Sequence, residues 1–149
     1  MARRIFKQLA VLAFLVYLTP SVKAELAVIV HPDNPMDTLT QHQVRRIFLG
    51  RMPLYPNTGD QVLTLDLPAN DPCFDAFYST VVEMGGTKLK RYRAYYLFSG
   101  RGKLPKELTS HGDMLKTVAT NKLAVGYVDS KYIDQSVKVL LTISHPLCK

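Results

Sequence analysis

The sequence predicts a single three-layer α/β domain behind a short export segment. Apolar runs rich in β-branched residues alternate with amphipathic segments of helical length, which is typical of strands and helices in one layered sheet. Capping residues mark the ends of the amphipathic segments. The chain after residue 24 is long enough for one core and too short for two ordinary domains. The alternation also favours parallel pairing of the strands.

The first 24 residues have the layout of a secretory signal peptide. Basic residues precede an apolar run, Leu9–Leu18, of about half the length that a helix needs to span a bilayer. Residues 22–24 then offer a small-x-small cleavage site. We therefore expect a signal peptide at 1–24 and a periplasmic domain at 25–149. An uncleaved membrane anchor is the alternative.

The expected mature domain has a small positive net charge. The whole chain has 19 Lys and Arg against 12 Asp and Glu, but four of the basic residues and none of the acidic ones lie in 1–24. The remainder gives little reason to expect a nucleic-acid partner. Cys73 and Cys148 could form a disulfide in an oxidising compartment. A reactive Cys73 thiol is the alternative, although no base lies near it in the chain.

The first two elements are a strand and a strongly signalled helix. "LAVIV" (26–30) is a continuous apolar run, as expected of a strand buried on both faces. In "LTQHQVRRIFLG" (39–50), Thr40 and Gln43 can form a capping box, and an apolar face follows. Gly50 stands where a left-handed C-cap residue belongs.

A second strand and a second helix come next. "QVLTLDLP" predicts a strand that ends at Pro68. Asp71 is placed to cap the following helix, and Pro72 takes its first position, where a missing N–H costs nothing. The apolar stripe of this helix recurs at helical spacing and consists of Phe74, Phe77, Tyr78, Val81 and Val82.

The rest of the chain predicts two helices and two strands. "TKLKRYRAYYLF" is a helix with Leu89, Tyr92, Tyr96 and Phe98 facing inward and Lys88, Lys90, Arg91 and Arg93 facing outward. "SGRGKLP" is a loop. Ser110 and Asp113 form a second capping box before another helix, and "LAVGYV" and "VKVLLTI" are strands.

The order of four motifs resembles the short phosphate-transporter-type substrate-binding proteins of bacteria. The motifs are "LTQHQVRRIFLGR", "LDLP" before a capped helix with "FDAFY", "YYLFSGRGKLP" and "AVGYVD", and they span about Leu26–Asp129. The resemblance implies one lobe of a type II periplasmic-binding-protein fold. It also implies phosphate or another oxyanion as ligand, an ABC transporter as membrane partner, and no catalysis.

The loop before the second helix is the first candidate anion site, because helix N-termini present free N–H groups. Asn70 can donate a hydrogen bond, and Asp71 can accept one from a protonated oxyanion. An ordinary N-cap is the alternative role of Asp71. The matching loop of larger phosphate binders resembles Arg-x-Asp-Gly-Ser-Gly-Thr. This chain lacks its arginine, hydroxyls and glycines.

Two further stretches are candidates. In Ser99-Gly100-Arg101, glycine lets the backbone approach a ligand and arginine supplies charge, although a flexible surface loop is the alternative. Thr40 begins the first helix, where its hydroxyl also serves as the cap.

The residues give no support to an enzyme or a metal site. His31, His42, His111 and His145 have no metal-ligand spacing, and no Ser, His and acid arrangement suggests a hydrolase. We expect no cofactor. The alternative function is a ligand-free interaction or sensory module of the same fold. It would dock on a membrane sensor, porin or envelope complex through aromatic anchors, namely Tyr92, Tyr95, Tyr96 and Phe98.

Overall fold

The computed structural model describes residues 25–144 and residue 148. In chain order the elements are β1 (Glu25–Val30), α2 (Gln41–Phe48), β2 (Leu63–Asp66), α3 (Pro72–Ala76), the π-helical turn η1 (Phe77–Val81), α4 (Gly86–Phe98), β3 (Lys106–Glu107), α5 (His111–Thr120), β4 (Ala124–Asp129), the 3-10 turn η2 (Ser130–Tyr132) and β5 (Lys138–Ser144). The expected signal peptide lies outside the described residues. Among the helices that are described, none has the length and apolar character needed to cross a membrane.

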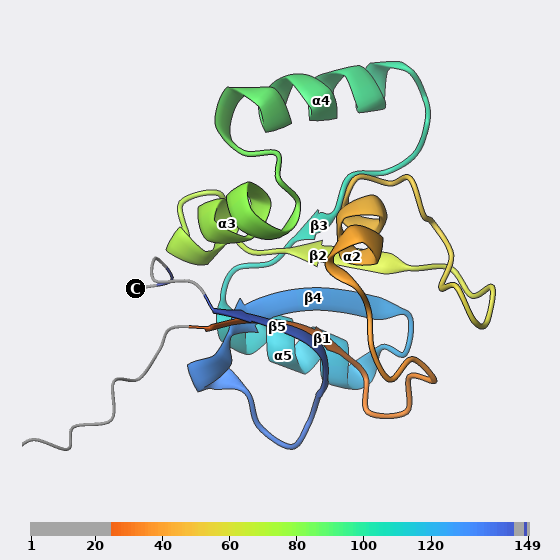
Figure 1. Ribbon diagram of the computed structural model, residues 1–149, viewed down its shortest axis with the longest axis vertical. Helices are drawn as coiled ribbons and strands as arrows, with labels where there is room; N and C mark the ends of the chain where they lie inside the picture. The colour runs from red at the N-terminus through yellow and green to blue at the C-terminus, as the bar shows by residue number, and fades with distance from the viewer. Residues whose placement is uncertain (1–24, 145–147, 149) are drawn as a thin grey trace, which may run out of the picture.

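The strands form one mixed sheet in the order β3-β2-β4-β1-β5 (Figure 1). Strand β2 runs parallel to β3 and β4, whereas β1 runs antiparallel to β4 and β5. The prediction of parallel pairing is therefore wrong for β1. Parallel strands need a long crossover connection, but the converse does not hold, and α2 connects β1 to β2 although the two strands run in opposite directions.

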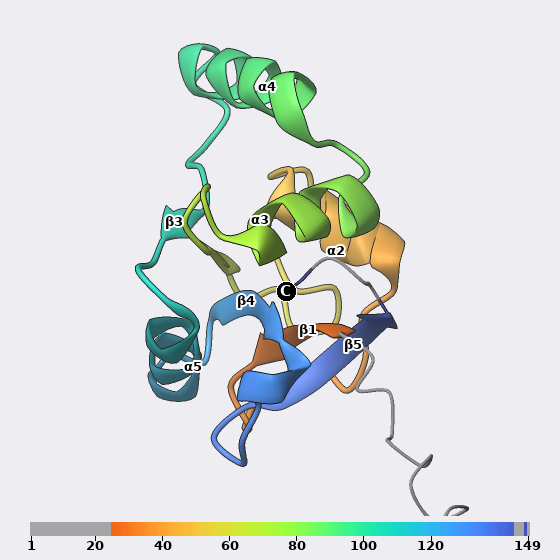
Figure 2. The same ribbon diagram turned by 90° about the vertical axis from the view of Figure 1, so that its left-hand side faces the viewer.

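Helices cover both faces of this sheet, which confirms the three-layer α/β arrangement (Figures 1 and 2). Successive residues of β4 show the division, because side chains alternate between the faces of a strand. Gly126 leaves room for Met114 of α5 on one face. On the other face the Tyr127 ring stacks on Phe77 of η1, with ring centroids 3.7 Å apart, and meets Phe48 of α2 edge-on.

Helix α3 begins as its sequence predicts. Asp71 accepts a hydrogen bond from the Cys73 N–H, and Pro72 occupies the first helical position. The predicted apolar stripe of α3 and η1 is buried. A disulfide joins Cys73 to Cys148, with their Cα atoms 4.7 Å apart, so Cys73 carries no free thiol.

Helix α4 forms an outer layer beyond α2 and α3 (Figures 1 and 2). Its buried residues are Leu89 and Tyr96. The predicted inward position of Phe98 is wrong, because its side chain is 92% exposed. Phe98 follows Leu89 by nine residues, and nine steps of about 100° place it on the opposite side of the helix.

Candidate functional site

The loop before α3 contains two of the predicted site residues, Asn70 and Asp71. Asn70 is exposed, and its side chain has no hydrogen-bond partner within the described part of the chain. One Asp71 oxygen accepts from the Cys73 N–H at 2.8 Å, and the other lies 3.2 Å from His111 Nε2. The Asp71 carboxylate therefore occupies the place that an external anion would take at this helix end, and Pro72 removes one further N–H donor.

His111 lies against Asp71 and stacks on the Tyr132 ring, with centroids 4.4 Å apart. Burial lowers the pKa of His111 and the charge of Asp71 opposes that shift, so the imidazole is neutral at pH 7. Ligand atoms of Asp71, Cys73 and His111 lie within 4.8 Å of one another, a proximity that spacing in the sequence does not reveal. The Cys73 sulfur belongs to the disulfide and offers no thiolate, so these residues do not fit a metal ion.

Thr40 is the N-cap of α2. Its hydroxyl accepts from the Gln43 N–H at 3.2 Å, and its own N–H donates to Gln43 Oε1 at 2.8 Å. The predicted capping box is confirmed. Both polar groups of Thr40 are therefore engaged in the helix end itself.

Ser99, Gly100 and Arg101 follow the C-terminal end of α4, where the helix dipole is negative. The Ser99 hydroxyl donates to the Tyr96 carbonyl at 3.0 Å, and Gly100 has a φ of 65°, which favours glycine. The Arg101 guanidinium lies 5.6 Å from the centre of the Tyr95 ring. Arg101 is thus the member of this group that offers positive charge to a ligand.

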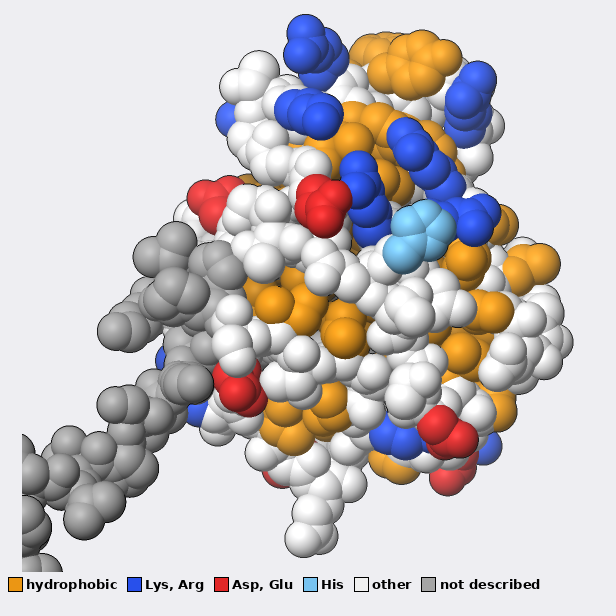
Figure 3. Space-filling model, viewed as in Figure 1, with side chains coloured by type: hydrophobic (Ala, Val, Ile, Leu, Met, Phe, Trp, Pro, Cys, Tyr) orange, Lys and Arg blue, Asp and Glu red, His pale blue; other side chains and the backbone are white. Residues whose placement is uncertain are grey.

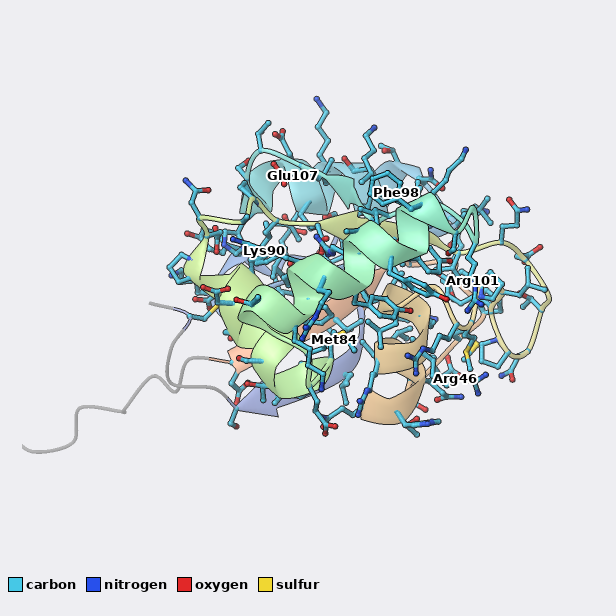
Figure 4. The ribbon with its side chains drawn as sticks, turned by 90° about the horizontal axis from the view of Figure 1, so that it is seen from above. Arg46, Met84, Lys90, Phe98, Arg101 and Glu107 are labelled. Carbon is cyan, nitrogen blue, oxygen red and sulfur yellow. A yellow bond between two sulfur atoms is a disulfide. The ribbon has the colours of Figure 1, made fainter. Side chains whose placement is uncertain are left out.

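Arg101 lines a hollow of about 610 Å³ between the C-terminal end of α2 and the C-terminal half of α4. The other lining residues are Gly50, Arg51, Tyr92, Tyr95 and Tyr96. A second hollow of about 310 Å³ shares Arg51 and continues along α2 over His42, Arg45, Arg46 and Leu49. We call the two hollows together the α2–α4 groove. Figure 4 shows Arg46 and Arg101 on the same side of the molecule, beside the C-terminal end of α4.

The groove is positively charged and lined by tyrosines. Arg45 pairs with Glu83, but among the described residues no carboxylate lies within ion-pair distance of Arg46, Arg51 or Arg101. The Arg51 guanidinium lies 5.5 Å from the centre of the Tyr92 ring. Stacking on aromatic rings orients both Arg51 and Arg101 while leaving their N–H groups available.

Tyrosine hydroxyls of α4 attach that helix to the end of α2. Tyr92 donates to the Leu49 carbonyl at 2.6 Å, and Tyr96 donates to the Gly50 carbonyl at 3.3 Å. Gly50 and Gly102 both have positive φ, and a Cβ at either position would overlap the Tyr96 hydroxyl. The glycines of two separate sequence motifs therefore make room for one side chain.

A buried ion pair that the sequence analysis did not predict fixes the middle of α4, between Tyr92 and Tyr96. Asp66 of β2 is 2% exposed and pairs with Arg93 at 2.6 Å. Hydroxyls of Tyr78 and Tyr127 donate to the same carboxylate at 2.8 and 3.2 Å. The prediction that Arg93 faces outward is wrong, because its guanidinium reaches between the Phe74 and Tyr78 rings toward Asp66.

The Asp66 carboxyl group finds its charge partner and its hydrogen-bond donors inside the protein. Burial raises the pKa of Asp66, while the charge of Arg93 and the tyrosine hydrogen bonds oppose the rise. Burial and the Asp66 charge raise the pKa of Tyr78 well above its ordinary value, so Tyr78 remains a hydrogen-bond donor. Because Asp66 already takes these donors, they are not available to an external oxyanion.

The sheet, its covering helices and the order of the elements define the class: this is the fold of one lobe of the phosphate-transporter type of periplasmic binding protein. No protein-family model matches the sequence, and a search of curated proteins finds no match.

Three solved structures illustrate the likeness. A candidate phosphate ABC transporter substrate-binding protein from Clostridium perfringens with bound phosphate has a TM-score of 0.64 at 20% identity, over 78% of this chain and 44% of that one. An ABC-type phosphate transport receptor from Vibrio cholerae gives 0.64 at 21%, over 78% and 45%. PstS from Borrelia burgdorferi gives 0.60 at 13%, over 80% and 48%. The chain thus spans less than half the length of these proteins, and at such identities the likeness concerns the fold.

Proposed function

We propose that this chain is an exported, non-catalytic protein that binds phosphate or a similar oxyanion in the α2–α4 groove. The observation that carries the proposal is the pair Arg51 and Arg101, which line one hollow without a described carboxylate partner. Guanidinium groups match the geometry of oxyanions and bind them with two parallel hydrogen bonds. The likeness to lobes of phosphate-binding proteins supports the same ligand class.

The groove is preferred over the loop at Asn70 and Asp71 on electrostatic grounds. A carboxylate at the α3 end repels a second anion, whereas the groove concentrates positive charge. A single lobe leaves the ligand open to water, so we expect weak binding that declines with added salt. In this proposal residues 1–24 are a cleaved export signal, and a membrane transporter component is the partner.

Isothermal titration with phosphate, sulfate and arsenate tests the ligand. We expect a dissociation constant near the millimolar range. Arg51→Gln or Arg101→Gln should weaken binding roughly tenfold, because a hydrogen bond to a charged group contributes about 1.5–3 kcal/mol and solvent exposure favours the low end of that range. Lys116→Gln on α5 is the matched control, because Lys116 is exposed and distant from the groove. No heat and no thermal shift at millimolar ligand would refute the proposal.

The titration also distinguishes the two candidate sites. If Asn70→Ala abolishes binding and Arg101→Gln does not, the ligand binds at the α3 end. Mass spectrometry of protein recovered from the periplasm tests the export signal, and a chain that retains residues 1–24 would contradict cleavage.

A further inference from the structure

The charge of this chain is concentrated in one segment. Residues 84–106, which contain α4 and the loop after it, hold seven Lys and Arg and no Asp or Glu. Within the described residues only Arg93 of these seven has a carboxylate partner. Residues 25–149 as a whole contain 15 Lys and Arg against 12 Asp and Glu, so the part outside this segment is acidic. The molecule therefore has a basic end and an acidic body.

The exposed side of α4 adds apolar groups to this charge. Side chains of Tyr95, Leu97 and Phe98 are 59%, 52% and 92% exposed. On a helix with Leu89 and Tyr96 buried, Arg91 and Phe98 lie on the opposite side, Lys88 and Tyr95 on one flank, and Lys90 and Leu97 on the other flank. All six are exposed, and we call them together the outer face of α4. Figure 3 shows Lys and Arg side chains around hydrophobic ones at this end of the molecule, and Figure 4 shows Lys90 and Phe98 toward opposite ends of α4.

We propose that the outer face of α4 docks on the surface of an anionic lipid bilayer. Phe98 and Leu97 enter the headgroup region, and Lys88, Lys90 and Arg91 contact lipid phosphates. Basic residues beside exposed aromatic ones are the two features that bind peripheral helices to anionic membranes. The acidic body is repelled by the same surface, so the charge division also orients the molecule with α4 toward the lipid.

Charge and shape select the bilayer over a second copy of this chain. A symmetric dimer through the outer face would bring two sets of cations together, which is unfavourable. Phe98, at the C-terminal end of α4, is 92% exposed. Helix α4 is itself the outermost layer (Figure 2). A convex apolar group of this kind enters a fluid bilayer without needing a preformed pocket.

This inference does not depend on the proposed oxyanion function. Of the outer face, Tyr95 also lines a hollow of the groove, whereas Lys88, Lys90, Arg91 and Phe98, which the variants below replace, line neither hollow. Phosphate titration of the outer-face variants therefore reports on one proposal, and vesicle binding reports on the other.

Co-sedimentation with lipid vesicles tests the docking. The protein is expressed from the full sequence and its N-terminus is determined by mass spectrometry, because an attached Leu9–Leu18 run would bind lipid by itself. Vesicles are phosphatidylcholine alone or phosphatidylcholine and phosphatidylglycerol in equal parts. We expect binding to the anionic vesicles, weaker at high salt, and little to the neutral ones.

Variants locate the contact. Replacing Lys88, Lys90 and Arg91 together by Gln should weaken binding by about a hundredfold, at roughly fivefold for each charge. Phe98→Ala should weaken it by about tenfold. The matched controls on the body, Lys116→Gln and Leu123→Ala, remove one exposed cation and one exposed apolar side chain and should leave binding unchanged.

Four outcomes would overturn the proposal. These are no binding to either vesicle, equal binding to both, outer-face variants that bind like the controls, and a dimer in light scattering that Phe98→Ala disrupts while vesicles are not bound. The last result would assign the outer face to a second copy of the chain. Circular dichroism confirms that all variants have the same helix content. If residues 1–24 remain attached, they are present in the wild type and in every variant, so differences in vesicle binding still report on the replaced residues.

Discussion

Replacing Arg93 by Met should destabilise the protein, because the buried Asp66 carboxylate then loses its charge partner. The substitution keeps much of the side-chain volume between the Phe74 and Tyr78 rings but removes the charge that faces Asp66. Breaking a buried ion pair costs about 3–5 kcal/mol. The Arg93 side chain is 22% exposed, so we expect the low end, about 3 kcal/mol. For a domain of this size that corresponds to a fall in Tm of roughly 10–15 °C.

The loss should depend on pH, and its sign follows from the shifted pKa of Asp66. Burial raises that pKa in the folded protein above its value in the unfolded chain, which is about 3.9. The folded state therefore holds the proton more tightly, and ionisation of Asp66 reduces stability as pH rises through the folded-state pKa. Removing Arg93 raises this pKa further. The destabilisation should consequently be larger near neutral pH than in mild acid.

Urea unfolding of the wild type and the variant at both pH values measures the effect. Arg91→Met is the matched control, because Arg91 is exposed on the same helix without a described partner, and it should change stability by no more than about 0.5 kcal/mol. Asp66→Asn combined with Arg93→Met should recover part of the loss, since a neutral amide needs no counter-charge. An equal loss at both pH values would refute the electrostatic explanation and attribute the effect to packing.

Three other changes test separate parts of the structure. Gly50→Ala should cost about 1–3 kcal/mol, because it combines a positive φ with overlap on Tyr96, and an unchanged urea midpoint would contradict this. Replacing Cys73 and Cys148 by Ser should cost about 4 kcal/mol in the chain-entropy model, given a separation of 75 residues, and equal stability with and without reductant in the wild type would argue against the disulfide. Burial lowers the pKa of His111 below its unfolded value, so stability should fall as pH drops through about 6.5; a His111→Gln variant with the same pH slope would exclude this histidine as the cause.

Local chemistry made much of this fold predictable from the sequence. The Thr40 capping box, the Asp71 cap and the left-handed Gly50 depend on residues within a few positions of one another, and the structure has all three. The alternation of strands and helices likewise predicted the layers. It could not predict the direction of β1, because a helical connection can join antiparallel as well as parallel strands.

The site was harder to predict because its contacts join distant segments. Arg93 reads as one more cation on a basic helix, and only the fold brings it to Asp66, 27 residues earlier in the chain. The glycines beside Arg101 indicate it in the sequence as a candidate source of charge, and in the structure it lines the α2–α4 groove. No sequence pattern indicates its neighbour Arg51, since the groove exists only when α4 packs beside the end of α2. A usable signal was present in "YRAYY", where Tyr92 and Tyr96 stand one helical turn apart on the face that contacts α2.

The attachment of α4 connects the two proposals physically. Besides the buried Leu89, three polar contacts hold helix α4 to the body, namely those of Tyr92 with Leu49, Tyr96 with Gly50 and Arg93 with Asp66. These contacts fix one side of the helix and thereby leave its other side bare. The same geometry places Arg51 and Arg101 along a groove and leaves Phe98 exposed outside it. A loss of the Arg93 contact should therefore weaken both phosphate and vesicle binding, whereas variants of the groove or of the outer face should weaken only one.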